Sequence, residues 1–276
     1  MGTLRDDDGE SRVHAELLLP EVLRGSHLDE VAAVFRRVAP EWSRRVVASA
    51  SEGGAGVPID FGKSGSIEQT LDLERARLGA LGFGEASDAQ WFEGATREFE
   101  LQVERNDHAA VRRGRSLALT NRITLIVPGR TVENQPAARW IVLAISTLAN
   151  RLDPVYGFAR TFGEFAWKNK TPPTPRGSPM GLDLSRSLPG LYWLNLFGGP
   201  YVELIGRSRL LATPAGRVEE VGVGVVVSLS EGPWSWRTPE YRDTEQRVLD
   251  HLGRDLFYDR AAVDRVTRAP SLTPQN

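Results

Sequence analysis

The sequence predicts an α+β fold in which helices pack on one face of an antiparallel sheet. Three observations carry this prediction. Strand and helix patterns follow one another in runs and do not alternate regularly as β-α-β-α. The clearest pair of strand patterns is separated by a polar stretch, as in a hairpin. The chain of 276 residues, 41% hydrophobic and 25% charged, is typical of a globular protein that buries a sizeable core without cross-links.

The chain is predicted to form one domain over residues 13–266. We expect a flexible N-terminal tail at 1–12 and a disordered end at 267–276, because both segments are polar. No clear linker divides the region between them. Two loosely related halves are an alternative, since the helix pattern 27–39 precedes RRVVASA and the helix pattern 136–152 precedes VYGFAR.

The first half of the chain contains four strand patterns and two helix patterns. The helix at 27–39 follows Ser26, a favourable N-cap, and Ser66 with Gln69 forms a capping box at the start of the second helix. Phe99, Leu101 and Val103 alternate with polar residues, which predicts a strand with one wet face. The predicted strands cover 12–19, 44–50, 99–103 and 117–127, and the helices cover 27–39 and 66–81.

The second half opens with the strongest helix pattern of the chain, at 136–152, where Pro136 fits the first helical turn. A long loop is predicted at 168–188 from its proline, glycine and serine content. The remaining expected elements are strands at 155–160 and 191–197, a short helix from Pro200 to Gly206, one long strand at 221–229 and a last helix beginning at Thr238–Pro239.

Composition excludes several classes of function. There is no cysteine, so disulfides, thiolate metal sites and a cysteine nucleophile are absent. The formal net charge of −2 argues against nucleic-acid binding, which needs a concentrated basic surface. The polar N-terminus is unlike a secretory signal, and the longest apolar runs are too short to span a membrane. We therefore expect a cytoplasmic protein that binds no nucleic acid and no membrane.

The candidate windows of this sequence do not match known catalytic or ligand-binding motifs. The window Gly62–Ser66, GKSGS, lacks the second glycine of the nucleophile elbow. The four histidines are far apart in sequence and fit no metal-ligand spacing. No glycine-rich segment matches a phosphate-binding fingerprint. Glu240, Asp243 and Glu245 are interpreted as charges that favour the start of the last helix. No motif identifies a catalytic residue, and we expect neither a bound metal nor a cofactor.

The segment 189–206, PGLYWLNLFGGPYVELIG, gathers large aromatic residues around a Gly-Gly pair and contains almost no charge. Two interpretations stay open: these rings form core, or they form a surface that docks a partner. Trp234 and Trp236 add two indoles near a chain reversal. On the docking interpretation, the candidate partner-binding residues are Tyr192, Trp193, Tyr201, Glu203, Trp234 and Trp236.

The stretch from about 190 to 235 also resembles the C-terminal part of a family of bacterial immunity proteins. These are the inhibitors encoded beside toxins of polymorphic and type VI secretion systems. The resemblance rests on W-x-N-x-[FL]-G-x-x-[YV]-V, which begins at Trp193, and on a strand that ends near Gly232–Pro233. It implies a non-catalytic α+β protein that binds a cognate toxin and occludes the toxin's active site.

The first hypothesis is therefore a toxin-neutralising protein whose partner is a cognate protein toxin. An enzyme of unrecognised class is an alternative, with a cleft near the 168–188 loop and the Gly198–Gly199 turn. A structural or assembly protein that docks through exposed tryptophans is a further alternative. The sequence leaves the oligomeric state open.

Overall fold

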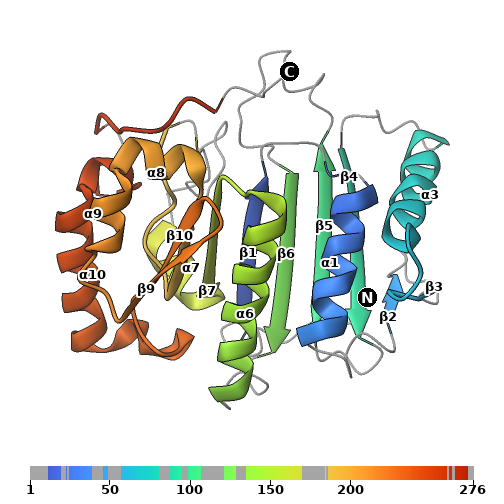
Figure 1. The fold of residues 1–276 in the computed structure, drawn as a ribbon, viewed down its shortest axis with the longest axis horizontal. Helices are drawn as coiled ribbons and strands as arrows, with labels where there is room; N and C mark the ends of the chain where they lie inside the picture. The colour runs from blue at the N-terminus through green and yellow to red at the C-terminus, as the bar shows by residue number, and fades with distance from the viewer. Residues whose placement is uncertain are drawn as a thin grey trace.

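A computed structural model describes residues 12–19, 23, 25–38, 46–48, 57–80, 87–94, 99–106, 121–128, 135–169, 184, 186–259, 261–262 and 265–272. Its strands form a ten-stranded sheet in the order β3-β2-β4-β5-β6-β1-β7-β8-β10-β9. Every pairing between neighbouring strands is antiparallel. The α+β class and the antiparallel sheet are therefore confirmed (Figure 1).

The strands are β1 (Arg12–Leu19), β2 (Val46–Ala48), β3 (Val57–Ile59), β4 (Ser87–Gly94), β5 (Glu100–Asn106), β6 (Asn121–Pro128), β7 (Tyr156–Thr161), β8 (Leu194–Phe197), β9 (Arg217–Val221) and β10 (Gly224–Ser228). The helices are α1 (Gly25–Val38), α3 (Ser66–Ala80), α6 (Gln135–Leu152), α7 (Phe162–Asn169), α8 (Gly199–Ile205), α9 (Arg207–Leu211) and α10 (Pro239–Leu252), with 3₁₀ turns η2 (Pro233–Arg237) and η3 (Arg254–Leu256).

One face of the sheet carries a core beneath α1, α3 and α6, as the sequence predicted. Strand β1 sends Val13 and Leu17 into this core, because alternate residues of a strand point to the same face. The ring of Phe35 on α1 packs against Phe61, Phe99 and Trp140 at centroid distances of 6.1, 5.4 and 5.8 Å. We call this cluster the first core.

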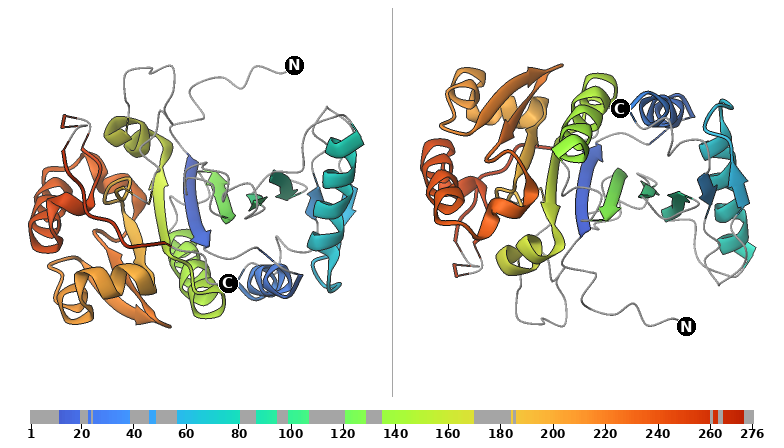
Figure 2. Two further views of the ribbon diagram at one scale, coloured as in Figure 1. Left: turned by 90° about the horizontal axis from the view of Figure 1, so that it is seen from above. Right: turned by 90° about the horizontal axis from the view of Figure 1, so that it is seen from below.

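The opposite face of the C-terminal strands carries a second core. Tyr156 and Phe158 of β7 and Phe197 of β8 enter it, and the buried sides of α8 and α10 close over it. Figure 2 shows α1 and α6 on one side of the central strands and α7 on the other. Helices thus cover one face of the N-terminal half, as expected, and a further set covers the reverse face of the C-terminal half.

The structure differs from the sequence prediction in several elements. Strands β3 and β4 and helices α7 and α9 were not predicted. The expected single strand at 221–229 is a hairpin, in which β9 ends at Val221 and β10 begins at Gly224. Gly222 between them has φ of 57°, a conformation that glycine adopts readily, and this reverses the chain. The expected loop from 168 begins later, because α7 extends to Asn169. Residues 170–183 of that loop lie outside the described residues.

The C-terminal segment is more ordered than predicted. Residues 265–272 have a described course in the structure, although we expected disorder from 267. The backbone N–H of Arg268 donates to the carbonyl of Asp255 at 2.8 Å, and Leu272 packs against the second core. The tail predicted at 1–12 lies outside the described residues, except that Arg12 begins β1.

Candidate functional site

The structure places three of the predicted binding residues in the interior. Tyr192, Trp193 and Tyr201 are at most 1% exposed. The Trp193 indole lies in the first core and donates a hydrogen bond to the carbonyl of Ser230 at 3.0 Å. Tyr192 and Tyr201 lie in the second core. These three side chains therefore present no surface to a partner, which agrees with the core interpretation of this segment.

The polar and glycine positions of the same segment are structural as well. The Asn195 side chain is fully buried, donates to the carbonyl of Tyr192 at 2.8 Å and accepts from the Tyr156 hydroxyl at 3.2 Å. A Cβ atom at Gly198 would lie 1.8 Å from the carbonyl oxygen of Pro154. Only glycine fits that approach, so the Gly198–Gly199 turn is a packed junction and gives no support to a cleft there.

An aromatic surface does form around η2 and the end of α7. Trp234 is 36% exposed, Trp167 is 45% exposed, and the largely buried ring of Trp236 lies 6.1 Å from that of Trp167. The guanidinium of Arg237 lies 4.6 Å from the Trp236 ring centroid, and that of Arg242 lies 5.6 Å from the Trp167 centroid. We call these five residues the tryptophan surface. Glu203, the remaining predicted residue, is exposed on α8.

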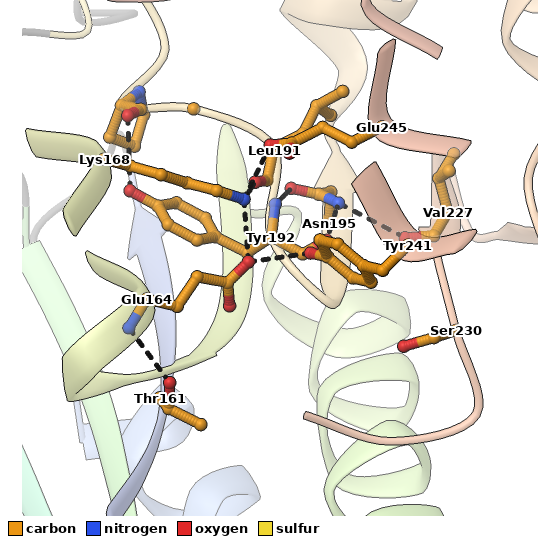
Figure 3. A network of polar contacts seen from close by, with 12 residues as sticks. Thr161, Glu164, Lys168, Leu191, Tyr192, Asn195, Val227, Ser230, Tyr241 and Glu245 are labelled. Atoms are coloured by element: carbon orange, nitrogen blue, oxygen red, sulfur yellow. Dashed lines mark hydrogen bonds and ion pairs between the residues drawn. The ribbon is translucent and has the colours of Figure 1, made fainter. Parts of the chain in front are cut away.

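Beneath this surface lies a buried ionic network, shown in Figure 3. The Lys168 Nζ atom lies 2.7 Å from a carboxylate oxygen of Glu164 and 2.7 Å from one of Glu245. It also donates to the carbonyl of Leu191. The Tyr241 hydroxyl donates to the same Glu164 oxygen at 2.7 Å. The side chains of the two glutamates and the lysine are each at most 9% exposed. We call this set the Lys168 network.

Local sequence explains how α7 positions the network. The Thr161 hydroxyl accepts from the backbone N–H of Glu164 at 3.1 Å, which caps the start of α7. Glu164 and Lys168 are then four residues apart, so their side chains meet on one helix face. Because Trp167 immediately precedes Lys168, the same helix carries the surface indole and the buried lysine.

Burial shapes the protonation of the network. Desolvation raises the pKa of Glu164, and the Lys168 ammonium opposes that shift. Desolvation likewise raises the pKa of the Tyr241 phenol, and the nearby Glu164 carboxylate adds to the rise. Among the described residues, the Oε2 atom of Glu164 has no hydrogen-bond partner. Lys168 and Tyr241 both donate to the other carboxylate oxygen of Glu164.

The network joins three separate parts of the chain. Glu164 and Lys168 come from α7, Leu191 comes from the segment before β8, and Tyr241 with Glu245 comes from α10. Since η2 leads directly into α10, the network joins the helix that carries Trp167 to the helix that follows Trp234 and Trp236. The contact between the Trp167 and Trp236 rings is a second link between these segments.

The sequence analysis named two residues of the tryptophan surface, Trp234 and Trp236, and Trp236 is only 9% exposed although we expected an exposed indole. It did not identify Trp167, Arg242 or the Lys168 network. Glu245 was interpreted as an exposed helix-start charge, but it is 7% exposed and pairs with Lys168. The available signal was the spacing of Glu164 and Lys168 within FGEFAWKN, a segment that otherwise resembles an apolar loop.

The chemistry-bearing motifs have structural roles where the structure describes them. The Ser64 hydroxyl donates to the carboxylate of Asp29, and the backbone N–H of Gly65 donates to the same side chain at 2.7 Å. Asp29 thereby ties α1 to the turn that precedes α3, and no histidine takes part in the contact. Within the described part of the chain, no group of three or more potential metal ligands is present. The helices described there also include none that is long and apolar enough to cross a membrane.

The geometry thus defines an α+β scaffold that presents a braced tryptophan surface. No protein-family model matches the chain. No curated protein matches it either. Among solved structures, the chain is similar to the Pseudomonas aeruginosa T6SS protein PA0821, with 14% sequence identity and a TM-score of 0.58. The alignment covers 89% of this chain and 73% of that protein. At this identity the similarity is one of fold.

Proposed function

We propose that this protein is a cytoplasmic immunity protein associated with type VI secretion, which binds a cognate toxin and occludes its active site. The single observation that carries the proposal is the tryptophan surface braced by the Lys168 network. The fold similarity to a T6SS protein and the sequence resemblance around Trp193 support the biological setting.

The physical chemistry of the surface supports protein binding. Tryptophan and arginine are enriched at residues that dominate binding energy, since they combine large apolar area with polar edges. Trp167 and Trp234 expose about two fifths of their area, and the guanidiniums of Arg237 and Arg242 lie against indole rings. A surface that is ordered before binding loses less side-chain entropy on association. The buried network supplies that order through contacts between α7 and α10.

The first test is a pull-down with the tagged protein in its native host, followed by mass spectrometry. We expect one stoichiometric partner encoded beside this gene. Co-expression with that partner should rescue growth that the partner alone inhibits. Recovery of copies of this chain alone, with a multimeric mass by light scattering, would instead support an assembly protein.

The second test places the surface. Trp167→Ala and Trp234→Ala should each raise the dissociation constant for the captured partner at least tenfold, or about 1.4 kcal/mol. Leu143→Ala is the matched control, because Leu143 is 52% exposed on α6, a helix of the first core. Equal affinity in all three variants, with the fold intact by circular dichroism, would remove the tryptophan surface from the interface.

A further inference from the structure

The face of the central strands opposite α1 and α6 carries a second polar cluster, separate from the tryptophan surface. The antiparallel registers place His14 of β1 opposite Arg160 of β7, and Glu16 of β1 opposite Thr124 of β6. Arg160 and Glu16 are only 6% and 3% exposed. Charged side chains are rarely this buried unless they are paired or bind a ligand.

Arg160 is held firmly on two sides. Its Nη2 atom donates to Glu16 Oε1 at 2.7 Å. Its guanidinium carbon lies 3.8 Å from the ring centroid of Phe165 on α7 and 5.7 Å from that of Phe158. A stacked guanidinium with one anchored nitrogen is fixed in orientation. The remaining N–H groups therefore point in set directions.

Those remaining N–H groups have no acceptor among the described residues. Nε and Nη1 of Arg160 are buried and make no hydrogen bond there. Glu16 accepts from Nη2 through one oxygen, and its other oxygen pairs with Arg122 at 3.4 Å. Leaving hydrogen-bond donors of a charged group buried without acceptors destabilises a protein. The geometry calls for an acceptor that the described side chains do not provide.

We propose that Arg160 is the centre of a binding site for a small oxyanion, a carboxylate or a phosphate, which accepts hydrogen bonds from its Nε and Nη1 groups. Oxyanions match the fork of a guanidinium and gain most where water is excluded. The small size follows from the burial of Arg160. His14 lies beside it across the strand pair, and its ring is 6.4 Å from Phe162, which is 42% exposed and forms the solvent edge of the cluster.

The test measures anion binding directly and needs no partner protein. Inorganic phosphate and acetate are titrated in separate arms, with chloride at the same ionic strength as the reference. We expect one of the two anions to raise Tm in a saturable way and to give a one-to-one isotherm by calorimetry. The anion that stabilises the protein identifies the chemical class of the ligand. If neither anion stabilises the protein beyond chloride, the proposal is wrong.

Variants connect the binding to Arg160. Arg160→Met combined with Glu16→Gln removes the guanidinium without leaving a buried carboxylate uncompensated, and should weaken binding at least tenfold. Arg160→Lys keeps the charge but loses the fork, and provides a second folded variant with the same expected loss. Arg151→Met is the control, since Arg151 lies on α6 over the opposite face of the sheet and pairs with Glu30 at 3.0 Å, and it should bind as the wild type does. Equal binding by all of these variants would place the anion elsewhere and overturn the assignment.

The result is also separable from the function proposed above. Trp167→Ala should bind the anion normally, and the Arg160 variants should still capture the partner protein. A loss of partner binding in the tryptophan variants alone, or of anion binding in the arginine variants alone, tells the two sites apart.

Discussion

At the scale of single residues, Lys168 is a buried cation that neutralises more than one carboxylate. It is the cation for two buried carboxylates, Glu164 and Glu245, and its side chain is 9% exposed. A buried ion pair adds little net stability when it is complete, but removal of one partner leaves a charge without compensation in a poorly polarisable interior. The consequence is that a neutral residue at this position is poorly tolerated.

Lys168→Met should therefore lower the free energy of unfolding by about 3–5 kcal/mol, measured by urea denaturation. Arg254→Met is the matched control, because the Arg254–Asp250 pair is exposed and an exposed pair contributes little to stability. Combining Lys168→Met with Glu245→Gln and Glu164→Gln should recover part of the loss. A Lys168 variant as stable as the Arg254 variant would contradict this account.

His14 predicts a pH dependence. Burial, followed by the Arg160 and Arg12 guanidiniums, lowers its pKa from 6.5 to about 3. Between those values the unfolded chain binds a proton that the folded protein does not, so stability falls as the pH drops from about 6.5 towards 3. The maximal slope for one proton is about 1.4 kcal/mol per pH unit.

The urea midpoint measured from pH 7.5 to pH 4 should therefore fall less steeply for His14→Gln than for the wild type. The raised pKa of Glu164 acts with the opposite sign, because the folded state then favours its protonated form, so the comparison between variant and wild type carries the test. Parallel curves for the variant and the wild type would contradict the assignment to His14.

At the scale of an element, the turn from β8 into α8 depends on a close backbone approach. The backbone N–H of Gly198 donates to the carbonyl of Val155 at 3.0 Å, which ties this turn to the start of β7. A Cβ atom at Gly198 would lie 1.8 Å from Pro154 O, whereas one at Gly199 would meet only the Val223 side chain at 3.7 Å. Adjacent glycines thus have different requirements.

Gly198→Ala should lower Tm strongly or prevent folding, because the contact is with backbone and both segments would have to move. Gly199→Ala should change the free energy of unfolding by less than about 1 kcal/mol. Thermal denaturation of the two variants side by side measures the difference. Similar melting temperatures would show that the Pro154 carbonyl can give way.

At the scale of the whole molecule, two cores share one sheet. Strand β1 and its neighbours β6 and β7 connect the first core to the second through continuous hydrogen bonding. Leu17 enters the first core and Leu18, the next residue, enters the second. A strand that serves both cores couples their stability, which favours one unfolding unit over two.

Unfolding should accordingly be a single transition. Phe35→Ala in the first core and Phe197→Ala in the second should each lower the stability of that one transition by about 3–5 kcal/mol. Tryptophan fluorescence and far-ultraviolet circular dichroism should give coincident curves. Two separated transitions, each sensitive to only one of the variants, would show that the halves unfold independently.

The sequence by itself determined the local elements. Hydrophobic residues that recur every two or every 3.6 positions indicate which side chains of a strand or helix are buried. Capping residues and prolines indicate where each element begins or ends. The strand at 12–19 and the helices α1, α3, α6 and α10 were therefore predictable, as was the short helix after Pro200. From Val221 to Leu229 the same alternating pattern continues on both sides of a chain reversal. The pattern therefore did not reveal the turn at Gly222.

Only the tertiary structure decided which polar and aromatic groups meet. Glu164 and Glu245 are distant in sequence and share Lys168 only because α7 and α10 pack on the same face. Trp193 and Trp234 look alike in sequence, yet one is 1% exposed and the other 36%. Local pattern records the face of an element, whereas burial and pairing depend on which other element covers that face, and that is a property of the assembled sheet.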